Sequence, residues 1–106
     1  MKTIGYNKLV RDRIPEFIEK SGKRCTVEVL NDTDYLAMID EKLDEELAEY
    51  HKDQNLEELA DLLEVIYAAT EARGYTINQL EETRLKKRAE RGAFKEKLLL
   101  RDVIEE

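Results

Sequence analysis

Residues 34–73 read DYLAMIDEKLDEELAEYHKDQNLEELADLLEVIYAATEAR, and this stretch decides the fold. Placed at about 100° per residue, its apolar side chains form one stripe before residue 53 and a second, wider one after residue 55. The stripes consist of Leu36, Ile39, Leu43, Leu47 and Tyr50, and of Leu56, Leu59, Leu63, Ile66 and Tyr67. The pattern predicts two long helices, over about 34–52 and 55–73. Because Asp53-Gln54-Asn55 is a very short connection, the helices should be antiparallel neighbours.

Shorter elements are predicted on both sides of this pair. A short helix is expected over about 14–20, where Pro15 suits the start and Ser21-Gly22 the end. Thr76 and Gln79 have the spacing of a capping box, which predicts a third helix lasting to about Arg91.

The segment at 25–30 alternates apolar and polar residues, which predicts a small strand. The tail from Ala93 to Glu106 is ambiguous. Its Leu98-Leu99-Leu100 run allows a strand over 97–101 paired with 25–30, or burial against a partner chain. The expected fold is therefore mainly α, a single domain over residues 1–106 built as an antiparallel helical bundle.

Composition limits the function. The 106 residues include 25 acidic and 18 basic side chains, for a net charge of -7, which argues against a nucleic-acid backbone as the main partner. One Cys and one His exclude an internal disulfide and a multi-histidine metal centre. No apolar run has the length of a signal or a membrane span, so we expect a cytoplasmic protein with no membrane partner. So small a core makes burial against a second copy plausible.

The charge is unevenly distributed. Acidic residues dominate positions 28–64, where only Lys42 and Lys52 are basic, whereas basic residues dominate 1–24 and 84–101. Solvated helix faces that happen to differ would explain this pattern. Alternatively, the fold brings cationic ends beside an anionic centre, as a site for a metal and a polyphosphate requires.

Four carboxylates border the apolar stripes. Glu46 and Glu49 flank the first stripe beside Lys42, and Glu58 and Asp61 fall in or at the edge of the second. Residues three apart share a helix face, and a carboxylate against apolar surface is costly unless it is compensated. Hard oxygen ligands on two rigid helices suit Mg²⁺, with Mn²⁺ as a possible substitute.

Other interpretations of these carboxylates remain open. In so acidic a chain the spacing can arise by chance, and Glu58 can instead pair with a basic residue across a subunit interface. Glu41 and Glu45 fall on the far side of the first helix and should be solvated.

The basic ends supply candidate phosphate ligands. Lys8 and Arg11 precede the short helix, and Lys87, Arg88 and Arg91 lie near the end of the third. Arginine gives planar, bidentate contacts to phosphate and lysine gives a point charge. Favourable interaction with the helix dipole also explains cations at a helix end.

Phe94 follows directly after this basic end. It is a candidate to stack on a base or ribose, although a core position is the commoner use of Phe. Gly92 is explained as a helix C-cap.

The sequence resembles a known superfamily. Lys42-Leu43-Asp44-Glu45-Glu46-Leu47-Ala48-Glu49 followed by Glu57-Glu58-Leu59-Ala60-Asp61 is similar to the signature of the MazG-like all-α nucleoside-triphosphate pyrophosphohydrolases. The opening from Tyr6 to Pro15 resembles a subgroup of predicted house-cleaning phosphohydrolases, and 88–94 resembles the R-G-G-F ending of the family, with Ala93 in place of the second Gly.

The resemblance implies a function and a site. It implies hydrolysis between the α and β phosphates of a nucleoside triphosphate by a homodimer or homotetramer, in a house-cleaning role on aberrant nucleotides. It also implies Mg²⁺ held by Glu46, Glu49, Glu58 and Asp61, with Glu46 or Glu49 as general base. The expected substrate ligands are Lys8, Arg11, Lys42, Lys87, Arg91 and Phe94.

Two alternatives compete with this expectation. One is a phosphoribosyl-ATP pyrophosphohydrolase, which cleaves the same bond but needs a site for the ribose phosphate. The other is a non-catalytic helical module for oligomerisation or regulation.

Overall fold

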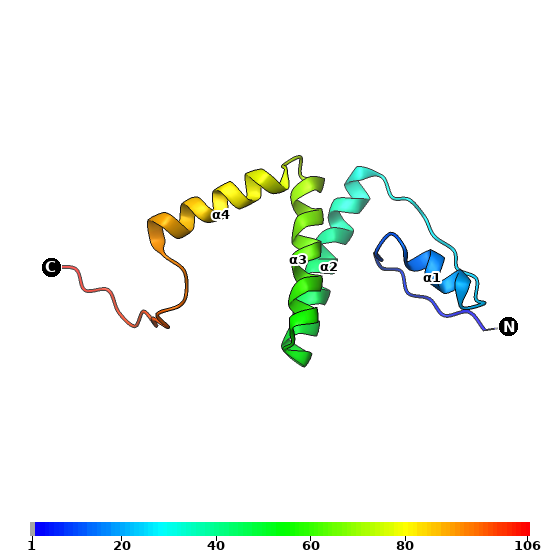
Figure 1. The fold of residues 1–106 in the computed structure, drawn as a ribbon, viewed down its shortest axis with the longest axis horizontal. Helices are drawn as coiled ribbons and strands as arrows, with labels where there is room; N and C mark the ends of the chain where they lie inside the picture. The colour runs from blue at the N-terminus through cyan, green and yellow to red at the C-terminus, as the bar shows by residue number, and fades with distance from the viewer. Residues whose placement is uncertain (1) are drawn as a thin grey trace. The chain divides into compact units, whose positions relative to one another are not determined.

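A computed structural model describes residues 2–106 of the chain. Its helices are α1 (Ile14–Lys20), α2 (Asp32–Asp53), α3 (Leu56–Ala72) and α4 (Ile77–Arg91) (Figure 1). Each lies within two residues of a predicted helix, so the mainly helical fold is confirmed. The chain divides into two compact units, residues 1–75 and 76–106, and each is described by itself.

The hairpin of α2 and α3 dominates the first unit, and the two helices pack against each other (Figure 1). Gln54 ends α2 in the left-handed conformation, with φ 49° and ψ 38°. Asn55 then begins α3, since its side-chain oxygen accepts a hydrogen bond from the Glu58 N–H at 2.9 Å. One left-handed residue and one cap residue thus reverse the chain, as the short connection predicted.

The apolar stripes of the hairpin are only partly covered. Ile39 is 4% exposed and is the one buried residue in 2–106, whereas Leu47, Leu59 and Leu63 remain 42%, 44% and 46% exposed. Two helices can cover only part of a wide apolar arc. The hairpin therefore presents apolar surface, and the complete bundle stays a prediction.

The expected strand element is not confirmed. Residues 25–30 and 97–101 carry no strand pairing, and no strand occurs in the part of the chain that the structure describes. A strand is stabilised by hydrogen bonds to a neighbouring strand, and alternation of side chains cannot supply one. Val29 is 97% exposed, so the alternating segment has no apolar surface against which to pack.

The second unit consists of α4 and the tail. Thr76 and Gln79 form the predicted capping box, with the Gln79 N–H donating to Thr76 Oγ1 at 3.1 Å and the Thr76 N–H donating to Gln79 Oε1 at 2.8 Å. Gly92 ends the helix at φ 88°, which glycine adopts without strain. No helix within residues 2–106 combines the length and apolar character needed to cross a membrane.

Candidate functional site

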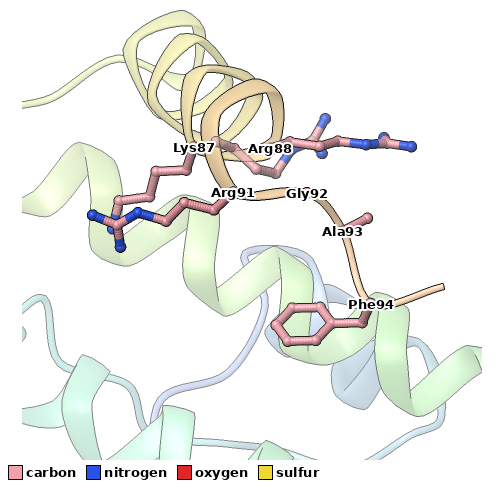
Figure 2. Close-up of a pocket in the computed structure, with 7 residues that line it drawn as sticks. Lys87, Arg88, Arg91, Gly92, Ala93 and Phe94 are labelled. Carbon is pink, nitrogen blue, oxygen red and sulfur yellow. The ribbon is translucent and has the colours of Figure 1, made fainter. Parts of the chain in front are cut away.

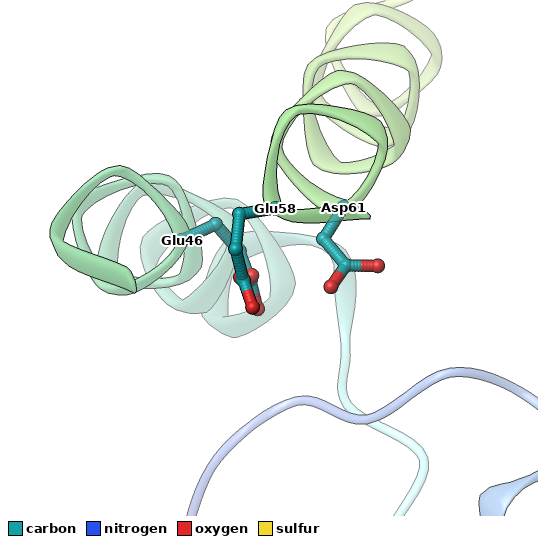
Figure 3. Close-up of side chains that lie close together, drawn as sticks. All are labelled: Glu46, Glu58 and Asp61. Carbon is teal, nitrogen blue, oxygen red and sulfur yellow. The ribbon is translucent and has the colours of Figure 1, made fainter. Parts of the chain in front are cut away.

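Three of the predicted carboxylates meet at the closed end of the hairpin. Glu46 extends from α2 toward Glu58 and Asp61 in the first turns of α3 (Figure 3). One carboxylate oxygen from each lies within 4.8 Å of the other two, and all three residues are half-buried. The Asn55 cap fixes the backbone at Glu58 and thereby sets the start of this arrangement. We call Glu46, Glu58 and Asp61 the acidic cluster.

Glu49, the fourth predicted ligand, belongs to a second group. One oxygen from each of Glu49, Asp53 and Glu58 also lies within 4.8 Å of the others. Glu58 is therefore shared, and the four carboxylates form two overlapping groups. Asp53 was not predicted to take part. Its position four residues after Glu49, on the same helix face, was the available signal.

Negative charge accumulates around Glu58. Burial, followed by the charges of Asp61, Asp53, Glu49 and Glu46, raises the pKa of the Glu58 carboxyl. A cation among these oxygens would relieve this repulsion. The donor set of carboxylate oxygens on two helices fits a hard divalent ion such as Mg²⁺. The geometry permits such an ion, although acidic groups of this kind also occur without one.

Lys42 lies at the edge of the acidic cluster, as predicted. Its Nζ is 3.3 Å from Glu46 Oε1 and 3.4 Å from Glu45 Oε1. The Lys42 and Glu46 side chains are only 17% and 13% exposed. Lys42 therefore compensates the charge of Glu46 from one helical turn earlier in α2.

Glu45 was predicted to be solvated, but it is half-buried and paired. Its side chain is 33% exposed and accepts a hydrogen bond from Lys8 Nζ at 3.0 Å. Burial raises the pKa of Glu45, but the Lys8 hydrogen bond and the charge of Lys42 outweigh this and lower it overall. A wheel drawn for α2 alone could not show that the segment around Lys8 lies against this flank.

Arg11 also contacts the acidic cluster. Its Nη2 donates to Asp61 Oδ1 at 2.6 Å, with side chains 58% and 41% exposed. Lys8 and Arg11 were predicted to bind phosphate, and in this structure both pair with carboxylates of the hairpin. The N-terminal segment thus brings positive charge to the predicted site, as the uneven charge distribution suggested.

The remaining predicted ligands lie in the second unit. Lys87, Arg91 and Phe94 line a pocket of about 440 Å³ at the end of α4 (Figure 2). Phe94 is 99% exposed, so it is not a core residue in this chain. Arg84 was not predicted, although its spacing to Arg88 and Arg91 places all three on one helix face. The full lining is Arg84, Lys87, Arg88, Arg91, Gly92, Ala93 and Phe94, which we call the basic pocket.

The basic pocket favours an anion. Lys87, Arg88 and Arg91 form no ion pair with a carboxylate of residues 2–106, whereas Arg84 pairs with Glu81 at 2.7 Å. Unpaired cations beside an exposed aromatic ring are suited to a phosphate and to a flat apolar group. Arrangements of this kind can bind a nucleotide.

The chain is 56% identical over 41 residues to an uncharacterised protein from Mycolicibacterium smegmatis (strain ATCC 700084 / mc(2)155). The match spans 39% of this chain and 42% of the relative, so less than half of each is compared. No family model and no solved structure matches the chain.

Proposed function

We propose that the protein is a metal-dependent nucleoside triphosphate pyrophosphohydrolase that releases a nucleoside monophosphate and pyrophosphate. The observation that carries the proposal is the acidic cluster, in which oxygens of Glu46, Glu58 and Asp61 lie within 4.8 Å of one another. The resemblance of residues 42–49 and 57–61 to the MazG-like signature supports it. House-cleaning of aberrant nucleotides is the role that we propose for this activity.

The acidic cluster and Glu49 would hold Mg²⁺, with Mn²⁺ as a substitute. The bound ion would polarise phosphate oxygens and lower the pKa of a water molecule. Glu46 or Glu49 would accept a proton from the attacking water. Each contributes an oxygen to one of the two overlapping carboxylate groups. Lys42 Nζ lies 3.3 Å from Glu46 Oε1 and would help to hold this carboxylate in place.

The basic side chains bind the triphosphate. Lys8 and Arg11 lie beside the acidic cluster and would neutralise oxygens of the bound phosphates. Lys87 and Arg91 would bind phosphate in the basic pocket, and Phe94 would stack on the base or ribose. Lys8 and Arg11 would also stabilise charge that develops on the leaving pyrophosphate.

The test compares two neighbouring glutamates of α3. Glu58→Gln should abolish Mg²⁺-dependent release of pyrophosphate from a panel of standard and modified triphosphates while leaving the helix content unchanged. Glu57→Gln is the matched control, since Glu57 is exposed and lies outside both carboxylate groups. Full activity of Glu58→Gln would contradict the proposed site. Turnover of phosphoribosyl-ATP alone would favour the alternative substrate.

We also propose that the chain works as a homo-oligomer, either a dimer or a tetramer. The half-exposed Leu47, Leu59 and Leu63 supply apolar surface that a second copy can cover. This surface is also what a non-catalytic oligomerisation module would need.

Light scattering after size exclusion tests the oligomer. Leu63→Glu should shift the molecular mass toward that of the monomer, because it places a charge on the apolar surface. Glu64→Gln is the control on the adjacent, exposed position. An oligomer that lacks any Mg²⁺-dependent turnover would favour the module over the enzyme.

A further inference from the structure

The N-terminal segment holds the hairpin through two ion pairs that differ in kind. Lys8 Nζ lies 3.0 Å from Glu45 Oε1, and Arg11 Nη2 lies 2.6 Å from Asp61 Oδ1. Asp61 is a member of the acidic cluster, but Glu45 belongs to neither carboxylate group. Only the Arg11 pair therefore involves a carboxylate of the acidic cluster.

Arg11 and a divalent ion would compete for the Asp61 carboxylate. Both are attracted to the negative charge of Asp61, and a guanidinium and a metal cannot occupy the same lone pairs of its carboxylate. The Arg11–Asp61 pair is also half-exposed, so it contributes little stability and can be exchanged at low cost. Glu45 belongs to neither carboxylate group, so a bound divalent ion would not compete with Lys8 for it; Lys42 Nζ shares Glu45 Oε1 at 3.4 Å.

We propose that Arg11 is an exchangeable counter-ion of the acidic cluster. A divalent cation takes Asp61 from Arg11, and the released guanidinium becomes available to the phosphates of the substrate. Lys8 and Glu45 remain paired during this exchange and keep the segment beside the site. Glu45 is thus a positioning residue that acts through Lys8. The inference rests on the proposed function, because it takes Asp61 to be a metal ligand.

The exchange predicts an order of binding. Before the ion binds, Arg11 satisfies Asp61 and is not free to contact a phosphate. After the ion binds, the planar guanidinium can make bidentate contacts to phosphate oxygens. Binding of the metal would therefore free Arg11 for the substrate, in addition to its proposed role in hydrolysis.

Calorimetric titration of the full chain with Mn²⁺ alone tests the competition. Arg11→Gln should bind Mn²⁺ up to about fivefold more tightly than the natural chain, the factor expected for loss of an exposed ion pair. Arg13→Gln is the matched control, since it removes the same charge from the same segment. Arg13 pairs with Glu16 at 3.1 Å, outside the acidic cluster, so its affinity for Mn²⁺ should be unchanged.

A second readout follows the segment itself. Hydrogen exchange at Ile14, whose N–H donates to the Arg11 carbonyl at 3.0 Å, should become faster when Mg²⁺ is added to the natural chain, because the Arg11–Asp61 contact that holds this turn is lost. In Arg11→Gln the exchange should already be fast and should not respond to Mg²⁺. The inference would be overturned if Arg11→Gln and Arg13→Gln gained the same affinity for Mn²⁺. It would also be overturned if Mg²⁺ left the hydrogen-exchange rate of the natural chain unchanged.

The outcomes separate this inference from the proposed function. If the natural chain binds Mn²⁺ and Arg11→Gln binds it no more tightly than Arg13→Gln, only the exchange of Arg11 is refuted. If neither the natural chain nor Arg11→Gln binds millimolar Mn²⁺ or Mg²⁺, the metal site itself is refuted, and both proposals fall.

Discussion

Glu46→Gln tests the acidic cluster through protein stability. The substitution removes one of three converging charges and keeps the size of the side chain. In the absence of divalent ions two effects oppose each other. Loss of the Lys42–Glu46 pair, which spans one helical turn at 3.3 Å, costs about 0.3–0.5 kcal/mol. Relief of repulsion with Glu58 and Asp61 offsets part of this cost, so the melting temperature should move by only a few degrees.

Magnesium should separate the variant from the natural chain. At ten times the dissociation constant, a ligand specific for the folded state adds about 1.4 kcal/mol to the free energy of unfolding. In a domain of this size that corresponds to a rise in melting temperature of about 6–11 °C. If losing one ligand weakens binding about 100-fold, the same Mg²⁺ concentration adds less than about 0.1 kcal/mol to Glu46→Gln.

The assay is differential scanning calorimetry with and without MgCl₂, at fixed protein concentration and with ionic strength balanced by NaCl. Glu41→Gln is the matched control, since Glu41 is an exposed glutamate on the same helix and belongs to neither carboxylate group. It should keep the full stabilisation by Mg²⁺. If Glu46→Gln gains as much as Glu41→Gln, the placement of the ion in the acidic cluster is refuted.

Three further predictions concern the core, the basic pocket and pH. Ile39→Ala should destabilise the chain by about 2–5 kcal/mol in urea unfolding, whereas Leu56→Ala, at an 80% exposed position, should cost far less; similar losses would contradict the assigned core. Arg91→Gln should lower kcat/KM for a triphosphate about 10- to 150-fold by removing a charged hydrogen bond, and Lys95→Gln, outside the pocket lining, should not. Because the pKa of Glu58 is raised, its proton should return at a higher pH than in a free glutamate, so affinity for Mg²⁺ should fall as pH decreases through that pKa. Calorimetric titrations over a pH series should show this step in the natural chain and not in Glu58→Gln.

The local structure was predictable because short-range chemistry determines it. The apolar stripes predicted α2 and α3, and the Thr76–Gln79 capping box predicted where α4 begins. The short connection at 53–55 predicted antiparallel helices, and such neighbours bring Glu46 near Glu58 and Asp61. Helix periodicity and capping act within a few residues, so they can be worked out from the sequence.

Contacts between distant segments were decided only by the tertiary structure. Glu45 was predicted to be solvated, but Lys8, 37 residues away in sequence, pairs with it. Arg11 was predicted to bind phosphate, yet it contacts Asp61 across 50 residues. The expected strand over 25–30 required a pairing partner that the described chain does not provide. The sequence by itself determined the helices and the carboxylates on their facing turns, whereas which cation pairs with which carboxylate depends on how the N-terminal segment crosses the hairpin, and no periodicity encodes that path.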